Sequence, residues 1–225
     1  MEVSLLIPAY NAGALIQQTI QSVQTAFPDF KEIIVVDDGS QDDTKIKAAN
    51  AGARVLRLEK NRGKGNALNQ GAPLVQGEIV VLLDADLGES AAMFMPLLIP
   101  VLNQKADVTI AKFPPPPIKG GFGWVKGLAR HGIFSLTGKN IVSPLSGQRV
   151  MTREVFQSLL PFQEGFGVEV GAAIDILKQG WRWEEIEIDN LHHAYTGRNL
   201  GGFLHRGRQF YDISRTLIKK SGERS

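Results

Sequence analysis

Short apolar runs alternate with segments of helical periodicity through the first 90 residues, and this alternation restricts the fold more than any other feature. Each run suits one strand buried on both faces, and each intervening segment repeats apolar residues at helical spacing. The strands are expected at 3–7, 33–36, 55–58 and 80–83, with helices at 16–27, after Asp42-Asp43-Thr44, and through Leu68 and Ala72. This order predicts an α/β fold with a mostly parallel, doubly wound central sheet flanked by helices.

The second half continues with mixed elements. Helices are expected at 93–102, 124–136, 154–160, 168–178 and 203–218, and strands at 108–111, just after 149, and at 181–188. Four consecutive prolines followed by glycines predict a mobile surface loop at about 113–123. We therefore expect a single domain over 1–225, with one half at 1–110 and the other at 111–225.

Composition excludes several classes of protein. The chain has no cysteine, so disulfides and thiolate metal sites are excluded. Its N-terminus has no basic region before the short apolar run, and no apolar segment has the length of a bilayer. These features predict a cytoplasmic protein.

Basic residues dominate the second half, although the net charge is only +2. Residues 108–153 contain seven lysines and arginines and no acidic residue, and residues 190–220 contain a single acid, Asp212. This asymmetry predicts that the second half faces an anionic partner.

Two carboxylates, Asp84 and Asp86, follow the fourth apolar run directly. Residues two apart in an extended chain point to the same side, so both would project from the carboxyl end of the strand, where open α/β sheets bind ligands. Adjacent carboxylates repel each other unless a cation lies beside them, and an oxygen-preferring ion such as Mg²⁺ or Mn²⁺ fits. The plain alternative is a strand end followed by an aspartate-containing turn.

Two loops after strands should reach the same edge of the sheet, Pro8-Ala9-Tyr10-Asn11 and Asp37-Asp38-Gly39-Ser40. Tyr10 can stack on a base, and the aspartates can accept hydrogen bonds from base or ribose groups. The second loop is also a common turn sequence. Asn61-Arg62-Gly63-Lys64-Gly65-Asn66 opens a helix, where backbone N–H groups and Lys64 can approach phosphate. The loop lacks the P-loop pattern, and no Gly-x-Gly-x-x-Gly follows the first strand, which disfavours a dinucleotide-dependent redox enzyme.

In this order the motifs resemble those of the family 2 glycosyltransferases, which have the GT-A fold. The matching residues are Ile7–Asn11, Val35–Ser40, Asn61–Gly65 and Asp84-Ala85-Asp86. The resemblance implies a nucleotide-sugar donor, with a UDP-sugar favoured and a GDP-sugar as the alternative, bound by the half at 1–110. Pro8, Ala9, Tyr10, Asp37 or Asp38, and Lys64 would hold the nucleotide, and Asp84-Ala85-Asp86 would hold ribose, metal and diphosphate.

The second half resembles two groups of these enzymes. Gly147-Gln148-Arg149 resembles the Gly-x-Arg of polyprenyl-phosphate glycosyltransferases, although Gly88 stands where those enzymes often carry a metal-binding glutamine. Pro144–Gly147, Gly165–Gly171 and the later His193 and Arg198-Asn199 resemble glucosyl-3-phosphoglycerate synthases, in which a late histidine helps bind the metal. This implies that His192 or His193 completes a Mg²⁺ or Mn²⁺ site with Asp86; an ordinary surface histidine is the alternative.

The half at 111–225 would then be an acceptor-side extension, with Ser146, Gly147, Arg149, Glu169 and Arg198 as acceptor-binding residues. Asp86 and Glu169 are the expected catalytic residues. Glu169 can act as a general base or orient the acceptor, and Glu164 is its local competitor. A phosphate acceptor is already ionised and needs no strong base, so basic side chains would matter more. A small phosphorylated metabolite and a polyprenyl phosphate both fit, and inversion and retention stay open.

The sequence is compatible with other partners and functions. The basic, amphipathic last helix can be a lid over the donor, an interfacial helix on the inner membrane face, or a helix packed on the sheet. A homodimer is a further possibility, and no nucleic-acid partner is expected. A sugar-phosphate nucleotidyltransferase would share the sheet and metal but normally shows a different glycine-rich signature. A catalytically silent nucleotide-binding module is the third alternative.

Overall fold

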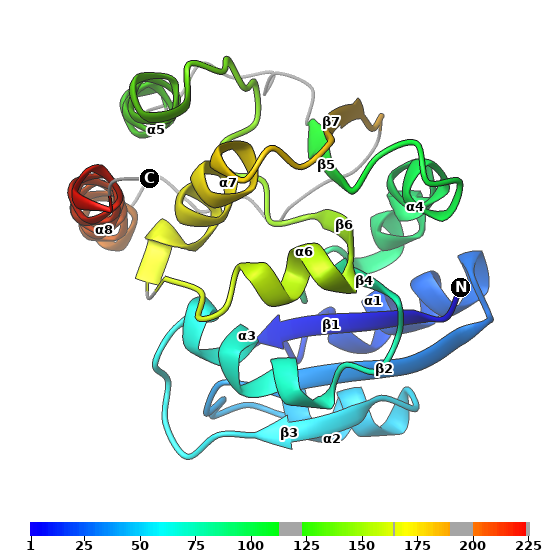
Figure 1. The fold of residues 1–225 in the computed structure, drawn as a ribbon. Coiled ribbons are helices and arrows are strands. Elements are labelled where there is room, and N and C mark those ends of the chain that lie inside the picture. The colour runs from blue at the N-terminus through cyan, green and yellow to red at the C-terminus, as the bar shows by residue number, and fades with distance from the viewer. Residues whose placement is uncertain (113–122, 164, 190–199, 224–225) are drawn as a thin grey trace.

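One mixed sheet forms the centre of the protein (Figure 1). The computed structural model describes residues 1–112, 123–163, 165–189 and 200–223. Within these residues the sheet has seven strands in the order β3-β2-β1-β4-β6-β5-β7. The strands are β1 (Val3–Ala9), β2 (Phe30–Asp37), β3 (Arg54–Arg57), β4 (Ile79–Leu82), β5 (Val108–Lys112), β6 (Arg149–Thr152) and β7 (Trp183–Glu187). The expected α/β class and mostly parallel sheet are confirmed.

The direction of β6 separates the two halves of the sheet. Strands β1 to β4 are parallel, as the alternation predicts, with β1 between β2 and β4. Strand β6 is antiparallel to both of its neighbours, β4 and β5, while β7 is again parallel to β5. Nothing in the alternation of elements predicts this reversal, which brings a second-half strand directly against β4.

Helices cover both faces of the sheet. They are α1 (Ile16–Ala26), α2 (Thr44–Asn50), α3 (Lys64–Gly71), α4 (Met95–Leu102), α5 (Gly123–Thr137), α6 (Arg153–Ser158), α7 (Val168–Lys178) and α8 (Leu200–Gly222). Alternate residues of β1 enter different cores, because successive strand side chains point to opposite faces. Leu5 and Ile7 pack with α1 and α4, whereas Leu6 packs with α3, α6 and α7.

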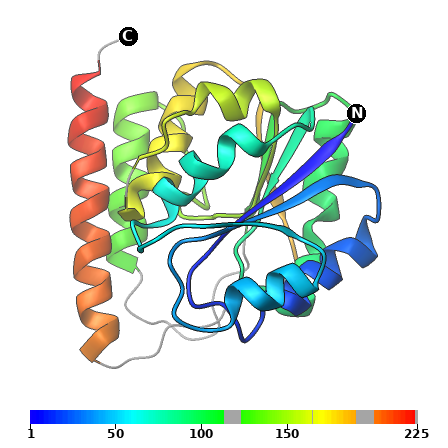
Figure 2. The ribbon, with the colours of Figure 1, turned by 90° about the horizontal axis from the view of Figure 1, so that it is seen from below.

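A third apolar cluster joins α5, α7 and α8 outside the main sheet layer. Figures 1 and 2 show α5 and α8 side by side at one edge of the molecule, with α7 between them and the sheet. The side chain of Leu217 lies against Gly132, so the two helices approach closely there. No helix within the described ranges is long and apolar enough to cross a membrane.

Several sequence expectations need correction at their boundaries. Strand β4 ends at Leu82, because its pairing with β1 and β6 stops there, so Asp84 follows the strand and Asp86 lies in a turn. A 3₁₀ segment at Gly88–Phe94 precedes α4. Gly88 has φ +56°, a conformation that favours glycine, and its N–H donates to Thr19 Oγ1. The proposed loop at 113–123 falls outside the described residues, except for Gly123, which begins α5.

Candidate active site

Lys64 lies between the carboxylates of Asp84 and Glu169. Its Nζ is 2.5 Å from Oδ1 of Asp84 and 2.8 Å from Oε1 of Glu169. Burial by itself would lower the pKa of Lys64, but the two carboxylates outweigh that effect and the pKa is raised. Lys64 therefore stays protonated at neutral pH and connects α3 of the first half with α7 of the second.

The antiparallel pairing of β4 with β6 explains why second-half residues reach Asp84. Leu82 pairs with Arg149, so the chain after Leu82 runs beside the chain before Arg149. A Cβ atom on Gly147 would lie 2.8 Å from Oδ2 and 2.9 Å from Oδ1 of Asp84, and would also meet Lys64 Nζ. A side chain at 147 would therefore force the charged ends of Lys64 and Asp84 to shift.

Gln148 is fully buried beside the same carboxylate. Its Nε2 donates to Oδ2 of Asp84 at 2.7 Å, while Lys64 holds Oδ1. Gln148 is not among the site residues predicted from the sequence, unlike its neighbours Gly147 and Arg149. One sequence signal could have pointed to it. Gln148 lies between Gly147 and Arg149, immediately before the strand that begins at Arg149.

Arg149 is buried and holds backbone atoms together. Its Nε donates to the carbonyl of Ser146 at 3.1 Å, and a terminal nitrogen donates to the carbonyl of Glu169 at 2.8 Å. Burial lowers the pKa of Arg149 to about 10, although Glu169 and Asp84 oppose that effect. With 3% of its surface exposed, Arg149 fixes the first turn of α7 and does not present its side chain as an open acceptor contact.

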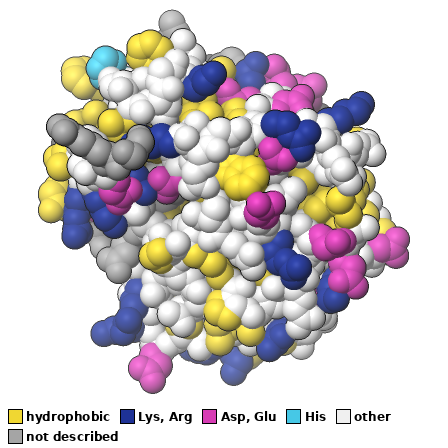
Figure 3. Space-filling model, in the orientation of Figure 1, with side chains coloured by type: hydrophobic (Ala, Val, Ile, Leu, Met, Phe, Trp, Pro, Cys, Tyr) yellow, Lys and Arg dark blue, Asp and Glu magenta, His cyan; other side chains and the backbone are white. Residues whose placement is uncertain are grey.

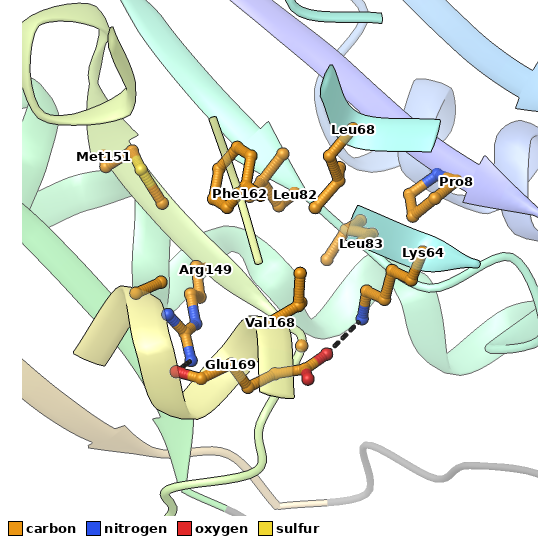
Figure 4. Close-up of a pocket in the computed structure, with 12 residues that line it drawn as sticks. Pro8, Lys64, Leu68, Leu82, Leu83, Arg149, Met151, Phe162, Val168 and Glu169 are labelled. Atoms are coloured by element: carbon orange, nitrogen blue, oxygen red, sulfur yellow. Dashed lines mark hydrogen bonds and ion pairs between the residues drawn. The ribbon is translucent and has the colours of Figure 1, made fainter. Parts of the chain in front are cut away.

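A narrow, mainly apolar pocket lies beneath these charges (Figure 4). The ends of Lys64, Arg149 and Glu169 border it on one side, and Figure 4 shows Lys64 pointing toward Glu169. Its apolar walls include Leu68, Leu82, Leu83, Met151, Phe162 and Ala172. Such walls exclude water on this side of the ion pairs, which strengthens the electrostatic interactions within the cluster.

The aspartate loop after β2 organises the sheet edge at the carboxyl ends of the parallel strands. Asp38 accepts hydrogen bonds from the backbone N–H groups of Arg62 (3.1 Å) and Gly63 (2.7 Å), which ties this loop to the start of α3. Burial raises the pKa of Asp38, against the opposing effect of these donors. Asp37 is fully buried; its Oδ1 accepts from the N–H of Ser40, whereas its Oδ2 forms an ion pair with Arg57 Nε at 3.8 Å, too long for a hydrogen bond.

The remaining site residues predicted from the sequence differ in burial, and some lie outside the described part of the chain. Pro8 lines the pocket, Ala9 ends β1 and Tyr10 is 47% exposed just beyond it. Ala85 and Ser146 are buried, and Asp86 is partly exposed in the turn after Asp84. Glu164, His192, His193 and Arg198 lie outside the described residues. Within the described part of the chain, no group of three histidine or acidic side chains could hold a metal by itself.

The family model "Glycosyl transferase family 2" matches residues 4–160. The chain belongs to glycosyl transferase family 2. The matched region of this family-2 glycosyltransferase contains all the motifs expected in the first 90 residues. It also contains β6 and the residues just before that strand.

Curated relatives include glucosyl-3-phosphoglycerate synthases. The chain is 32% identical to that of Mycobacterium tuberculosis strain H37Rv, over 94% of this chain and 68% of the relative. It is 30% identical to that of Petrotoga mobilis, over 80% of this chain and 62% of the relative.

Solved structures are similar over the whole length of the chain. The M. tuberculosis glucosyl-3-phosphoglycerate synthase in complex with Mn²⁺, UDP and phosphoglyceric acid matches with a TM-score of 0.82 at 30% identity. The match covers 100% of this chain and 80% of that one. The same enzyme with Mg²⁺ and UDP matches with a TM-score of 0.80 at 29% identity, over the same shares of the two chains.

Proposed function

We propose that this family-2 glycosyltransferase moves a sugar from a nucleoside diphosphate sugar, with UDP favoured over GDP, to a small phosphorylated acceptor in the presence of Mn²⁺ or Mg²⁺. The observation that carries this proposal is the Lys64 bridge between Asp84 on the donor side and Glu169 on the acceptor side. The similarity to structures holding UDP, Mn²⁺ and phosphoglyceric acid supports the same assignment.

The donor would bind along the edge formed by the loops after β1, β2 and β4. Tyr10 is exposed enough to stack on a base, and the loop that carries Asp37 and Asp38 would accept hydrogen bonds from base N–H or ribose groups. Asp84 would accept from ribose hydroxyl groups. Lys64 would neutralise diphosphate charge, and Asp86 with His192 or His193 would hold the metal, as carboxylate and imidazole ligands suit Mn²⁺.

When bound, the metal would stabilise the negative charge of the departing nucleoside diphosphate. The protein's own contribution is a preorganised set of charges in a partly closed site. Glu169 is 14% exposed at its side chain and pairs with Lys64, so its carboxylate would lie at the boundary between the two substrates. From there it would orient the acceptor or accept its proton. Ser146, Gly147 and Arg198 would contribute to the acceptor site. Arg149 would hold the backbone of Ser146 and Glu169 in place beside that site.

One structural feature favours a second acceptor, a lipid phosphate. The outer sides of α5 and α8 expose the large apolar side chains Trp124, Phe134, Phe210, Tyr211 and Ile218. They also expose the cations Lys126, Arg130, Arg215 and Lys219. Figure 3 shows hydrophobic side chains at the edge where these helices lie, with basic and acidic side chains among them. This combination suits an anionic membrane surface, and peripheral contact with the inner membrane face is the corresponding proposal.

Thermal unfolding in the presence of UDP, GDP, ADP and their glucose conjugates, with and without Mn²⁺, tests the donor. A ligand at 100 times its dissociation constant should add about 2.7 kcal/mol to the unfolding free energy. Asp86→Ala should keep its fold and lose the metal-dependent part of this shift. If no nucleotide raises the melting temperature with metal present, the function is wrong; unchanged metal-dependent binding in Asp86→Ala removes Asp86 from the metal site.

Product formation with radiolabelled UDP-glucose distinguishes the acceptors. Glucosyl transfer to 3-phosphoglycerate or glycerol 3-phosphate would support the small-molecule acceptor. Transfer to a polyprenyl phosphate, together with sedimentation on phosphatidylglycerol but not phosphatidylcholine vesicles at low salt, would replace it by the lipid acceptor. Release of free glucose with every acceptor would contradict both, and sedimentation velocity would test the expected homodimer.

A further inference from the structure

Asp84 has each of its two carboxylate oxygens held by a different side chain. Lys64 Nζ lies 2.5 Å from Oδ1, and Gln148 Nε2 lies 2.7 Å from Oδ2. A carboxylate that accepts from two directions is restrained in rotation about its Cβ–Cγ bond, because turning it would weaken both hydrogen bonds. These two hydrogen bonds therefore restrain the side chain of Asp84, although the residue lies outside the helices and strands.

Gln148 is itself fixed before any ligand arrives. The residue is fully buried, and its backbone carbonyl accepts a hydrogen bond from the N–H of Ala111 on β5. Its side-chain Oε1 lies 3.5 Å from the hydroxyl oxygen of Ser146, which can donate to it. The amide is therefore oriented with its nitrogen toward Asp84, from a residue that immediately precedes β6 and is hydrogen-bonded to β5.

The chemistry of a glutamine suits this position. The amide donates a hydrogen bond without adding charge, and the cluster of Lys64, Arg149, Asp84 and Glu169 already contains two cations and two anions. A lysine or arginine would add a buried cation, and a carboxylate would repel Asp84.

We infer that Gln148 is a positioning residue that orients Asp84 toward the ribose hydroxyl groups of the nucleotide. It does so from the position just before β6, at 2.7 Å from Asp84 Oδ2, without touching the substrate itself. The inference rests on the proposed function, because it assumes a ribonucleotide at Asp84. It adds a residue of the second half to the recognition of the donor.

Isothermal titration calorimetry of the full chain with Mn²⁺ tests this, using UDP, 2′-deoxy-UDP and 3′-deoxy-UDP as probes. The wild type should bind UDP about tenfold more tightly than at least one deoxy analogue, because a hydrogen bond to a charged group is lost. In Gln148→Met this ratio should fall to near one, while the affinity for that deoxy analogue changes by less than about twofold.

Thr109→Val is the matched control, since Thr109 is also fully buried and donates a hydrogen bond, to the carbonyl of Leu97 at 2.7 Å, away from Asp84. It should lower the melting temperature but keep the wild-type ratio. Should Gln148→Met not fold, Gln148→Asn, whose shorter amide is withdrawn from Asp84, is measured in the same way.

The possible outcomes separate the two proposals. Equal weakening of UDP and its deoxy analogues in the Gln148 variant, or a ratio that stays as in the wild type, overturns the positioning role. A wild type that binds UDP without distinguishing the analogues also overturns it, while nucleotide binding stands. A wild type that binds no UDP overturns the proposed function, and the role of Gln148 falls with it.

Discussion

Lys64 Nζ lies 2.8 Å from Oε1 of Glu169, and this ion pair joins the two halves of the protein across the candidate active site. Lys64 begins α3 and Glu169 lies in the first turn of α7, more than 100 positions later in the chain. A donor diphosphate would compete with Glu169 for the same ammonium group. The pair thus couples the proposed donor side to the proposed acceptor side.

Lys64→Met should impair binding and stability together. Asp84 and Glu169 would lose a shared cation in a partly buried site, and we expect a loss of about 1–3 kcal/mol of unfolding free energy. UDP affinity should fall by more than about tenfold because the diphosphate loses its cation. Chemical denaturation and calorimetry measure the two effects.

Lys31→Met is the control for this variant. It removes a pair with Glu2, whose side chain is 59% exposed, and should cost less than about 1 kcal/mol without changing UDP affinity. Wild-type UDP affinity in Lys64→Met would contradict the placement of the diphosphate.

Gly147→Ala should reduce activity by at least about tenfold. The added methyl group would lie 2.8 Å from Asp84 Oδ2, so Asp84 and Lys64 would have to move, at a cost of about 1–3 kcal/mol. Gly127→Ala is the matched control, because a Cβ atom there meets nothing within 4 Å and alanine should stabilise α5 by about 0.5–1 kcal/mol. Initial rates and melting temperatures check both; an unchanged rate in Gly147→Ala would be evidence against the tight approach at Asp84.

Asp107→Asn should destabilise the protein in a pH-dependent manner. Hydrogen bonds from Arg182, including one of 2.6 Å, lower the pKa of Asp107 below 3.8. A lowered carboxyl pKa contributes stability that is fully present above the unfolded-state value and is lost as the pH falls through the folded-state value. The stability difference from wild type in urea should therefore be largest near neutral pH and shrink below about pH 3.8. An equal difference at about pH 7 and pH 3 would refute this.

Only one of His192→Ala and His193→Ala should weaken Mn²⁺-dependent UDP binding, by about tenfold or more. Adjacent residues outside regular structure usually point in different directions, so the other variant serves as the control. Calorimetric titration of UDP at saturating Mn²⁺ makes the comparison. Two variants with wild-type affinity would place the third metal ligand elsewhere.

Much of the donor-side half follows from local sequence pattern. The strands through Ile7, Val36 and Leu82 were predictable because buried parallel strands are continuous apolar runs. The loops that follow them meet at one edge because parallel strands share a direction, so Asp37, Asp38 and Lys64 were predictable as neighbours of that edge. The length of the last helix was predicted less well, since its ends depend on packing rather than periodicity.

The structure of the second half, residues 111–225, depends more on contacts between residues that are distant in the sequence. Sequence by itself determined the class of fold and the family, and it predicted the loops that meet at the edge of the sheet, because periodicity and short motifs act over a few neighbouring positions. Only the tertiary structure decided that β6 runs antiparallel beside β4, that Gln148 and Gly147 reach Asp84, and that Arg149 is buried against backbone carbonyls. The reason is physical: strand direction and register are set by pairing across the sheet, and no local pattern in 143–152 records which strand will be its partner.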